Sequence, residues 1–260
     1  MSLMRFSYTL LALLSIAAPA TAQDWSWHKA LASGKTIEIK GINGDITAQA
    51  ATGNEVEVVA RKSAKRSDPD DVKIEVVESA NGFTICALYP DARRGEANEC
   101  QPGRGGRMNN RNNDTEVDFE VRLPRGVHFS GRTVNGSVRA TGLTARVVGH
   151  TVNGGVRIST TGLAEASTVN GGVNVRMGQT NWTDDLAFST VNGSITLEMP
   201  GQLDTDVQAS TVNGSISTDW PLTVRGKWGP RRMNGRIGNG GRDLELSTVN
   251  GDIEIRKTGS

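Results

Sequence analysis

One tetrapeptide, Thr-Val-Asn-Gly, recurs six times in this chain of 260 residues and limits the folds open to it. Two variants, Gly-Ile-Asn-Gly and Arg-Met-Asn-Gly, have the same form. The asparagines of the eight units are Asn43, Asn135, Asn153, Asn170, Asn192, Asn213, Asn234 and Asn250. From Asn135 onward they are spaced by 16 to 22 residues, less than a propeller blade or a helical hairpin repeat. A period of this length predicts one turn of a β-solenoid per unit.

Positions counted from each asparagine are apolar in a regular pattern. The third residue after it is always Ile or Val: Ile46, Val138, Val156, Val173, Ile195, Ile216, Ile237 and Ile253. The sixth residue before it is mostly apolar, and the fourth is mostly small or apolar. The second residue after it is mostly small or polar. This alternation is typical of strands with one buried face.

The residue directly before each asparagine is also apolar: Ile42, Val134, Val152, Val169, Val191, Val212, Met233 and Val249. We expect this column to point inward, so that Val191→Asp would bury an unpaired charge and destabilise strongly. A straight strand cannot place this position and the fourth before asparagine on one face. We therefore predict a bend at each Asn-Gly, because these residues tolerate positive φ. The asparagines are interpreted as structural corner residues whose amides stack in a ladder.

The repeat predicts an all-β chain folded as a single-stranded parallel β-helix. Each unit is too short to bury its apolar face alone, so neighbouring turns must cover one another and pair as parallel strands. An antiparallel sandwich is the alternative, because Asn-Gly also favours two-residue hairpins. The first and last units share one template, which favours a single domain over residues 23–260.

Composition excludes several classes of protein. The 29 basic and 28 acidic residues nearly balance, which argues against a generally basic nucleic-acid binder. The chain holds 31 Gly and only 5% aromatic residues, which suits β structure with many tight turns. No nucleic-acid partner is predicted.

Residues 1–22 have the form of an export signal. Arg5 is followed by an apolar stretch over 8–18 and by the small-x-small sequence Ala20-Thr21-Ala22. We expect cleavage after Ala22 and a mature chain that begins at Gln23, is periplasmic or secreted, and contains no transmembrane segment. The apolar stretch is shorter than the roughly 20 residues that a membrane span needs.

The two cysteines, Cys86 and Cys100, are predicted to form a disulfide in an oxidising compartment. Closing a loop of this length stabilises a fold by about 3 kcal/mol. A redox pair or a metal site is the alternative, although the spacing is too wide for Cys-x-x-Cys.

A long interruption over residues 90–114 surrounds Cys100 and is rich in arginine. Its five arginines are Arg93, Arg94, Arg104, Arg107 and Arg111. A loop of this length is either functional or disordered. We weigh two interpretations: a basic arm for an anionic envelope partner, such as lipid headgroups or acidic glycan, and a solvated excursion pinned by the disulfide.

Several stretches together resemble one bacterial family. These are the early Gly-Ile-Asn-Gly, the serial Ser-Thr-Val-Asn-Gly-x-Ile/Val units, and the segments 83–90, 98–100 and 121–127. The chain resembles the putative-adhesin family of domains of unknown function, β-strand-repeat envelope proteins related to head GIN domain adhesins. The resemblance implies a right-handed β-helix exported to the envelope, and it offers no catalytic residues to carry over.

Residues suited to catalysis or metal binding are scattered. The three histidines, His28, His128 and His150, lack metal-ligand spacing, and no phosphate- or dinucleotide-binding motif is present. No metal, cofactor or catalytic residue is predicted. The candidates for an alternative carbohydrate-cleaving activity, which needs paired carboxylates, are Asp184, Asp185, Asp204, Asp206 and Asp219.

Five tryptophans allow two interpretations. Trp182, Trp220 and Trp228 could form a sugar-stacking platform or fill the core, and Trp25 and Trp27 could cap the first coil. The sequence thus predicts a non-enzymatic, exported envelope interaction or scaffold protein with an unidentified protein or glycan partner. The alternative is a carbohydrate-binding or carbohydrate-cleaving β-helix.

Overall fold

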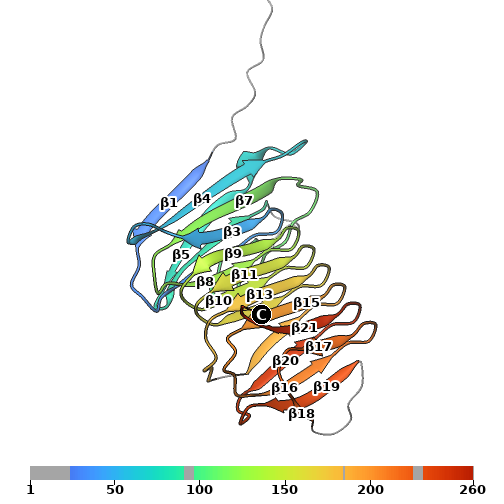
Figure 1. Ribbon diagram of the computed structural model, residues 1–260. Helices are drawn as coiled ribbons and strands as arrows, with labels where there is room; N and C mark the ends of the chain where they lie inside the picture. Colours follow the sequence, from blue (N-terminus) through green and yellow to red (C-terminus); the bar gives the residue numbers. More distant parts are fainter. Residues whose placement is uncertain (1–23, 91–96, 184, 225–230, 260) are drawn as a thin grey trace, which may run out of the picture.

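The computed structural model describes residues 24–90, 97–183, 185–224 and 231–259. In these residues the regular structure is 21 strands and one 3₁₀ turn, η1 (Pro69–Asp71). The strands form two large, mostly parallel sheets that face each other along an elongated stack (Figure 1). The all-β prediction is confirmed, and the fold is β-solenoid-like.

The first sheet has ten strands, in the spatial order β1 (Trp25–Ala30), β4 (Glu55–Ser63), β7 (Glu116–Leu123), β3 (Ile46–Ala50), β9 (Val138–Leu143), β11 (Val156–Thr160), β13 (Val173–Met177), β15 (Ile195–Met199), β21 (Ile253–Lys257) and β17 (Ile216–Thr218). The second sheet has eleven, in the order β18 (Thr223–Val224), β19 (Arg232–Ile237), β16 (Thr205–Ser210), β20 (Asp243–Ser247), β14 (Leu186–Ser189), β12 (Ala164–Ser167), β10 (Val147–His150), β8 (His128–Arg132), β2 (Thr36–Lys40), β6 (Gly82–Leu88) and β5 (Lys73–Ser79).

Seven of the eight repeat units each form one rung, with a strand in the second sheet, a corner, and a strand in the first sheet. Equivalent residues of neighbouring rungs pair in register, as Val156 does with Val173 and Val173 with Ile195. The residues three after the corner asparagines are buried between the sheets, except for Ile216, which is partly exposed. The predicted core columns six before and three after asparagine therefore form one continuous apolar core.

The corners are held by a ladder of asparagine side chains. Asn135 Nδ2 donates to Asn43 Oδ1 at 2.8 Å, and the same bond recurs between each successive pair of rungs. The ladder runs through Asn43, Asn135, Asn153, Asn170, Asn192, Asn250 and Asn213 in that spatial order. Asn234, predicted as an eighth corner, instead lies inside β19, which pairs antiparallel with β16.

The glycine after each corner asparagine is required by the closeness of the next rung. A Cβ atom added to Gly171 would lie 2.1 Å from the carbonyl oxygen of Gly154, and Gly171 has a φ of +156°. That carbonyl also accepts a hydrogen bond from the Thr168 hydroxyl, at 2.8 Å. The corner therefore has no room for a side chain at this position.

The prediction that the residue before asparagine points inward is wrong for the six Thr-Val-Asn-Gly units. Their valines are 37% to 55% exposed. The threonine one residue earlier takes the inward position, is at most 6% exposed, and donates to a glycine carbonyl of the adjacent rung. The strand keeps its alternation through this threonine, so the valine that follows must face outward.

The rungs do not stack in strict sequence order. The last rung, β20 and β21, inserts between the rung of Asn192 and that of Asn213, and Figure 1 shows the C-terminus inside the stack. At the other end, the rung of β2 and β3 is covered by β6 and β7, which follow it in sequence. Antiparallel strands flank both ends: β1, β4 and β5 at one, β18 and β19 at the other. The early residues thus supply two rungs and flanking strands.

We expect Gly171→Ala to lower the free energy of unfolding by about 2 kcal/mol or more, because the new methyl group overlaps the adjacent backbone. Gly53→Ala is the matched control, since it has open space around its Cβ position. Urea unfolding measures both. Equal stability of the two variants would contradict the close-approach argument.

Val191→Asp should now change the free energy of unfolding by less than about 1 kcal/mol, because the side chain is 39% exposed. Val173→Asp, at a position 1% exposed, should cost several times more because it buries a charge. Thermal and urea unfolding of the pair provide the comparison. If Val191→Asp proved as damaging as Val173→Asp, the outward orientation would be wrong.

Candidate functional site

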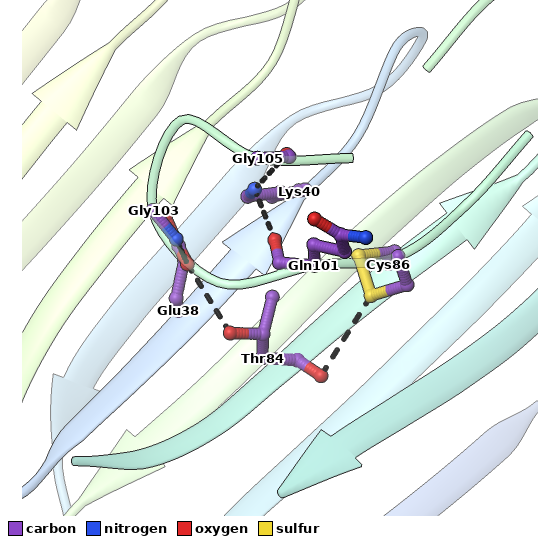
Figure 2. Close-up of a disulfide and its surroundings, with 8 residues drawn as sticks. Glu38, Lys40, Thr84, Cys86, Gln101, Gly103 and Gly105 are labelled. Atoms are coloured by element: carbon purple, nitrogen blue, oxygen red, sulfur yellow. Dashed lines mark hydrogen bonds between the residues drawn. A yellow bond between two sulfur atoms is a disulfide. The ribbon is translucent and has the colours of Figure 1, made fainter. Parts of the chain in front are cut away.

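The arginine-rich segment leaves the stack where the end rung lacks an Asn-Gly corner. This rung consists of β6 and β7, and residues 89–115 connect them. The disulfide between Cys86 and Cys100 is confirmed, with a Cα–Cα distance of 5.8 Å. Figure 2 shows that it fastens the returning part of the segment to β6.

Two charged residues of β2 hold the same segment down on the outer face of the second sheet. The Lys40 Nζ donates to the carbonyl oxygens of Gln101 and Gly105 (Figure 2). The Glu38 carboxylate accepts from the Gly103 backbone N–H at 2.8 Å. Both charged residues are only 6% exposed, so these bonds compensate for their removal from water.

Lys40 and Glu38 interact electrostatically with each other and with neighbouring polar groups. Glu38 also accepts from the Thr84 hydroxyl at 3.2 Å and from Arg132 Nε at 3.3 Å. Burial lowers the pKa of Lys40, and the nearby negative charge of Glu38 opposes that shift. The loop therefore covers a satisfied polar cluster and is fixed at three points: Lys40, Glu38 and the disulfide.

Three of the five candidate arginines lie in the described part of this loop. Arg104, Arg107 and Arg111 are exposed, whereas Arg93 and Arg94 lie outside the described residues. Asp114 accepts from the Ser67 backbone N–H at 2.8 Å and from the Arg66 backbone N–H. These hydrogen bonds hold the pKa of the Asp114 carboxyl well below the usual range. Next to the loop, an open groove of about 440 Å³ is lined in part by Phe83, Pro102 and Arg132.

The same face bears a histidine in a positive environment. Burial, the largest cause, and the charges of Arg132 and Arg104 together lower the pKa of His150 to about 4. His150 Nδ1 lies 2.6 Å from the Ser167 hydroxyl oxygen. The loop and the adjacent second sheet thus gather positive charge beside a neutral imidazole.

Residues 32–256 match the family described as Toastrack DUF4097. The chain belongs to this family. The predicted resemblance to a putative-adhesin family of unknown function is thereby confirmed at the level of the family. No curated protein matches the Toastrack chain.

Three solved structures show distant similarity to the Toastrack chain. A putative cell adhesion protein from Clostridium sporogenes is 10% identical with a TM-score of 0.48, over 91% of this chain and 100% of that one. A putative adhesin from Bacteroides fragilis is 12% identical with a TM-score of 0.36, over 90% and 97%. A putative lipid binding protein from Parabacteroides distasonis is 8% identical with a TM-score of 0.31, over 92% and 98%.

Three of the five carboxylates considered for carbohydrate cleavage have local partners in the Toastrack fold. Asp204 accepts from the Asn239 backbone N–H at 2.7 Å, and Asp206 lies 3.2 Å from Arg236 Nε. Asp219 accepts from the Lys257 backbone N–H at 2.9 Å. Asp185 has no hydrogen-bond or ion-pair partner among the described residues. Asp184 lies outside the described residues. Within the described ranges, no group of three or more His, Cys, Asp and Glu residues could hold a metal.

The described tryptophans are core or end-covering residues and not a platform for sugars. Trp182 and Trp220 are 7% and 6% exposed, and Trp228 lies outside the described residues. Trp25 and Trp27 of β1 are partly buried against the core at one end of the stack. In the part of the chain that the structure describes, no helix is long and apolar enough to cross a membrane.

Sequence reasoning missed Glu38 and Lys40. Their alternation with Ile37 and Ile39 predicts a solvated outer face, which is the usual place for such charges. The face is covered only because a loop from more than sixty residues later lies on it. No local sequence signal could have indicated this.

We expect acid to destabilise the fold partly through His150. Its folded-state pKa of about 4 lies below its ordinary 6.5, so the unfolded chain takes up a proton first and stability falls between those pH values. His150→Asn should reduce that loss by about 1 kcal/mol, allowing for solvent screening. Urea unfolding at pH 7 and pH 5 measures it, and an unchanged pH dependence would contradict the assignment.

Proposed function

We propose that this Toastrack protein is an exported, non-enzymatic interaction protein of the cell envelope that presents the loop of residues 90–114 to an anionic partner. One observation carries the proposal: exposed arginines sit on a segment fixed by a disulfide and by two buried charged residues. A segment already fixed loses less conformational entropy on binding. Acidic glycan and anionic lipid headgroups both have the required charge.

Export is supported by the disulfide, because such bonds persist in oxidising compartments. In this proposal residues 1–22 are removed after Ala22, and the mature chain is periplasmic or secreted. The coil is proposed to be a right-handed, single-stranded β-helix with 16 to 22 residues per turn. The asparagine ladder supports a structural role for seven of the eight predicted asparagines.

The test uses the protein expressed with residues 1–22 and recovered from the periplasm, with a mass that corresponds to a first residue at Gln23. Binding is measured to vesicles with and without anionic lipid and to an acidic polysaccharide. Replacing Arg104, Arg107 and Arg111 with Ser should weaken binding at least tenfold. Added salt should also weaken it, because exposed charges are screened.

The matched control removes three exposed basic residues elsewhere, Lys65, Arg122 and Arg125, and leaves binding near the wild-type value. Equal losses in the two triple variants would mean that net charge alone drives binding, and the loop would have no special role. An intact Met1 on the recovered protein would overturn export.

A further inference from the structure

A second surface, away from the arginine-rich loop, has the features of a binding site. An open groove of about 570 Å³ crosses the outer face of the first sheet beside the asparagine corners. It spans β9, β11, β13 and β15, which lie side by side in Figure 1. Besides two arginines, Arg139 and Arg157, its lining includes hydroxyl and amide side chains: Ser137, Ser194, Thr196 and Asn174.

Two glycines hollow out this groove. The second residue after the corner asparagine carries a side chain in the other rungs of the ladder, but it is Gly155 and Gly172 in two adjacent rungs. A Cβ atom at Gly155 would lie 3.4 Å from the Gly172 carbonyl oxygen, and one at Gly172 would lie 3.5 Å from that of Ser194. Both are ordinary contacts. Unlike the corner glycines, these two could carry a side chain without a clash with the adjacent backbone. A glycine that packing does not require can mark a place where a ligand approaches closely.

The missing side chains leave backbone N–H groups without an acceptor. At the ends of the stack, a side-chain oxygen at this position accepts from the N–H of the next rung: Asp45 Oδ1 from Ser137 at 2.7 Å, and Asp252 Oδ1 from Ser215 at 2.8 Å. Glycine offers no such oxygen. The N–H groups of Gly172 and Ser194 therefore have no hydrogen-bond acceptor among the described residues. The Gly155 N–H has none either, although Ser137, the equivalent residue of the preceding rung, carries a hydroxyl.

The rung next to the groove shows which chemical group fits these donors. There the Asp45 carboxylate accepts from both the Ser137 N–H and the Arg139 guanidinium, the latter at 2.6 Å. Arg157 pairs in register with Arg139 and is exposed, without an ion-pair partner in the described chain. The Gly155 N–H and Arg157 thus repeat the donor pair that binds Asp45, but the residue in the place of Asp45 is Ser137, which supplies no carboxylate.

We propose that this groove binds a carboxylated oligosaccharide. A sugar carboxylate accepts from the Gly155 N–H and Arg157, as Asp45 does from the preceding pair of donors. Sugar hydroxyls meet the N–H groups of Gly172 and Ser194, together with the Asn174 amide and the Thr196 hydroxyl. The rungs repeat at about 4.8 Å, so the donors form a regular row.

The lining favours a glycan over an acidic peptide. Three hydroxyls and an amide suit a polyhydroxylated ligand. An extended peptide usually binds by adding to an open strand edge, whereas β11 and β13 are paired on both sides. The proposal gives the envelope interaction a ligand class, but its site is separate from the arginine-rich loop.

Titration calorimetry of the mature chain with trimeric oligogalacturonate tests this site. Arg157→Gln should weaken binding at least tenfold. Gly155→Asp should abolish binding without loss of thermal stability, because its carboxylate can accept from the Gly172 N–H as Asp45 accepts from Ser137. Arg122→Gln, an exposed arginine outside the groove, is the matched control and should bind as the wild type does.

Four results would overturn the proposal: no binding of oligogalacturonate, equal binding of uncharged maltotriose, unchanged binding by a folded Gly155→Asp or by Arg157→Gln, or preferential binding of polyglutamate. The last would assign the groove to an acidic peptide. The triple loop variant at Arg104, Arg107 and Arg111 should still bind oligogalacturonate, and Gly155→Asp should still bind anionic vesicles. Failure of one site is therefore distinguishable from failure of the other.

Discussion

The structure depends on the close approach of successive rungs at their corners. Six of the seven corner glycines lie so near the carbonyl oxygen of a glycine in the adjacent rung that no side chain fits between them, and Gly44 lies equally near that of Val117. This contact sets the distance at which the asparagine amides bond from rung to rung and at which a threonine hydroxyl reaches the same carbonyl. Because both polar columns bond at that spacing, the apolar columns behind them meet in register and form the core. Replacing a corner glycine would therefore disturb the asparagine ladder, the threonine hydrogen bonds and the apolar core.

Both candidate sites are departures from this constraint. The corner threonine, asparagine and glycine all contact neighbouring rungs. Side chains can therefore differ from rung to rung only on the outer faces of the sheets and at the ends of the stack. In the end rung the corner is replaced by a loop, which then needs a disulfide, Lys40 and Glu38 to hold it in place. On the first sheet, Gly155 and Gly172 remove side chains that the backbone would tolerate. Departures that the fold does not require are the places where function is to be sought.

The sequence predicts the repeating part of the fold well because its information is local. The period, the buried column at Val156 and Val173, and the corner role of Asn170 all follow from one unit compared with the next. It fails where the outcome depends on which rungs become neighbours. Asn234 has the right local sequence but lies in an antiparallel strand, and the last rung inserts between two earlier ones. Val191 is apolar but faces outward, because the polar Thr190 takes the inward position and donates to the Gly171 carbonyl oxygen.

The insertion of the last rung also determines how far the groove extends. Asp252 belongs to that rung, and its own N–H donates to the Ser194 hydroxyl while its carboxylate accepts from Ser215. The side-chain acceptors are thus restored immediately beyond Ser194, just as Asp45 supplies one on the other side. Three unpaired N–H groups at the rung spacing span about 10 Å, with a carboxylate beyond each end. A longer carboxylated polymer lying along this row would meet like charges, so the groove suits a short stretch or a chain end. The chain order that the repeats alone could not reveal therefore sets the length of ligand that the surface can accept.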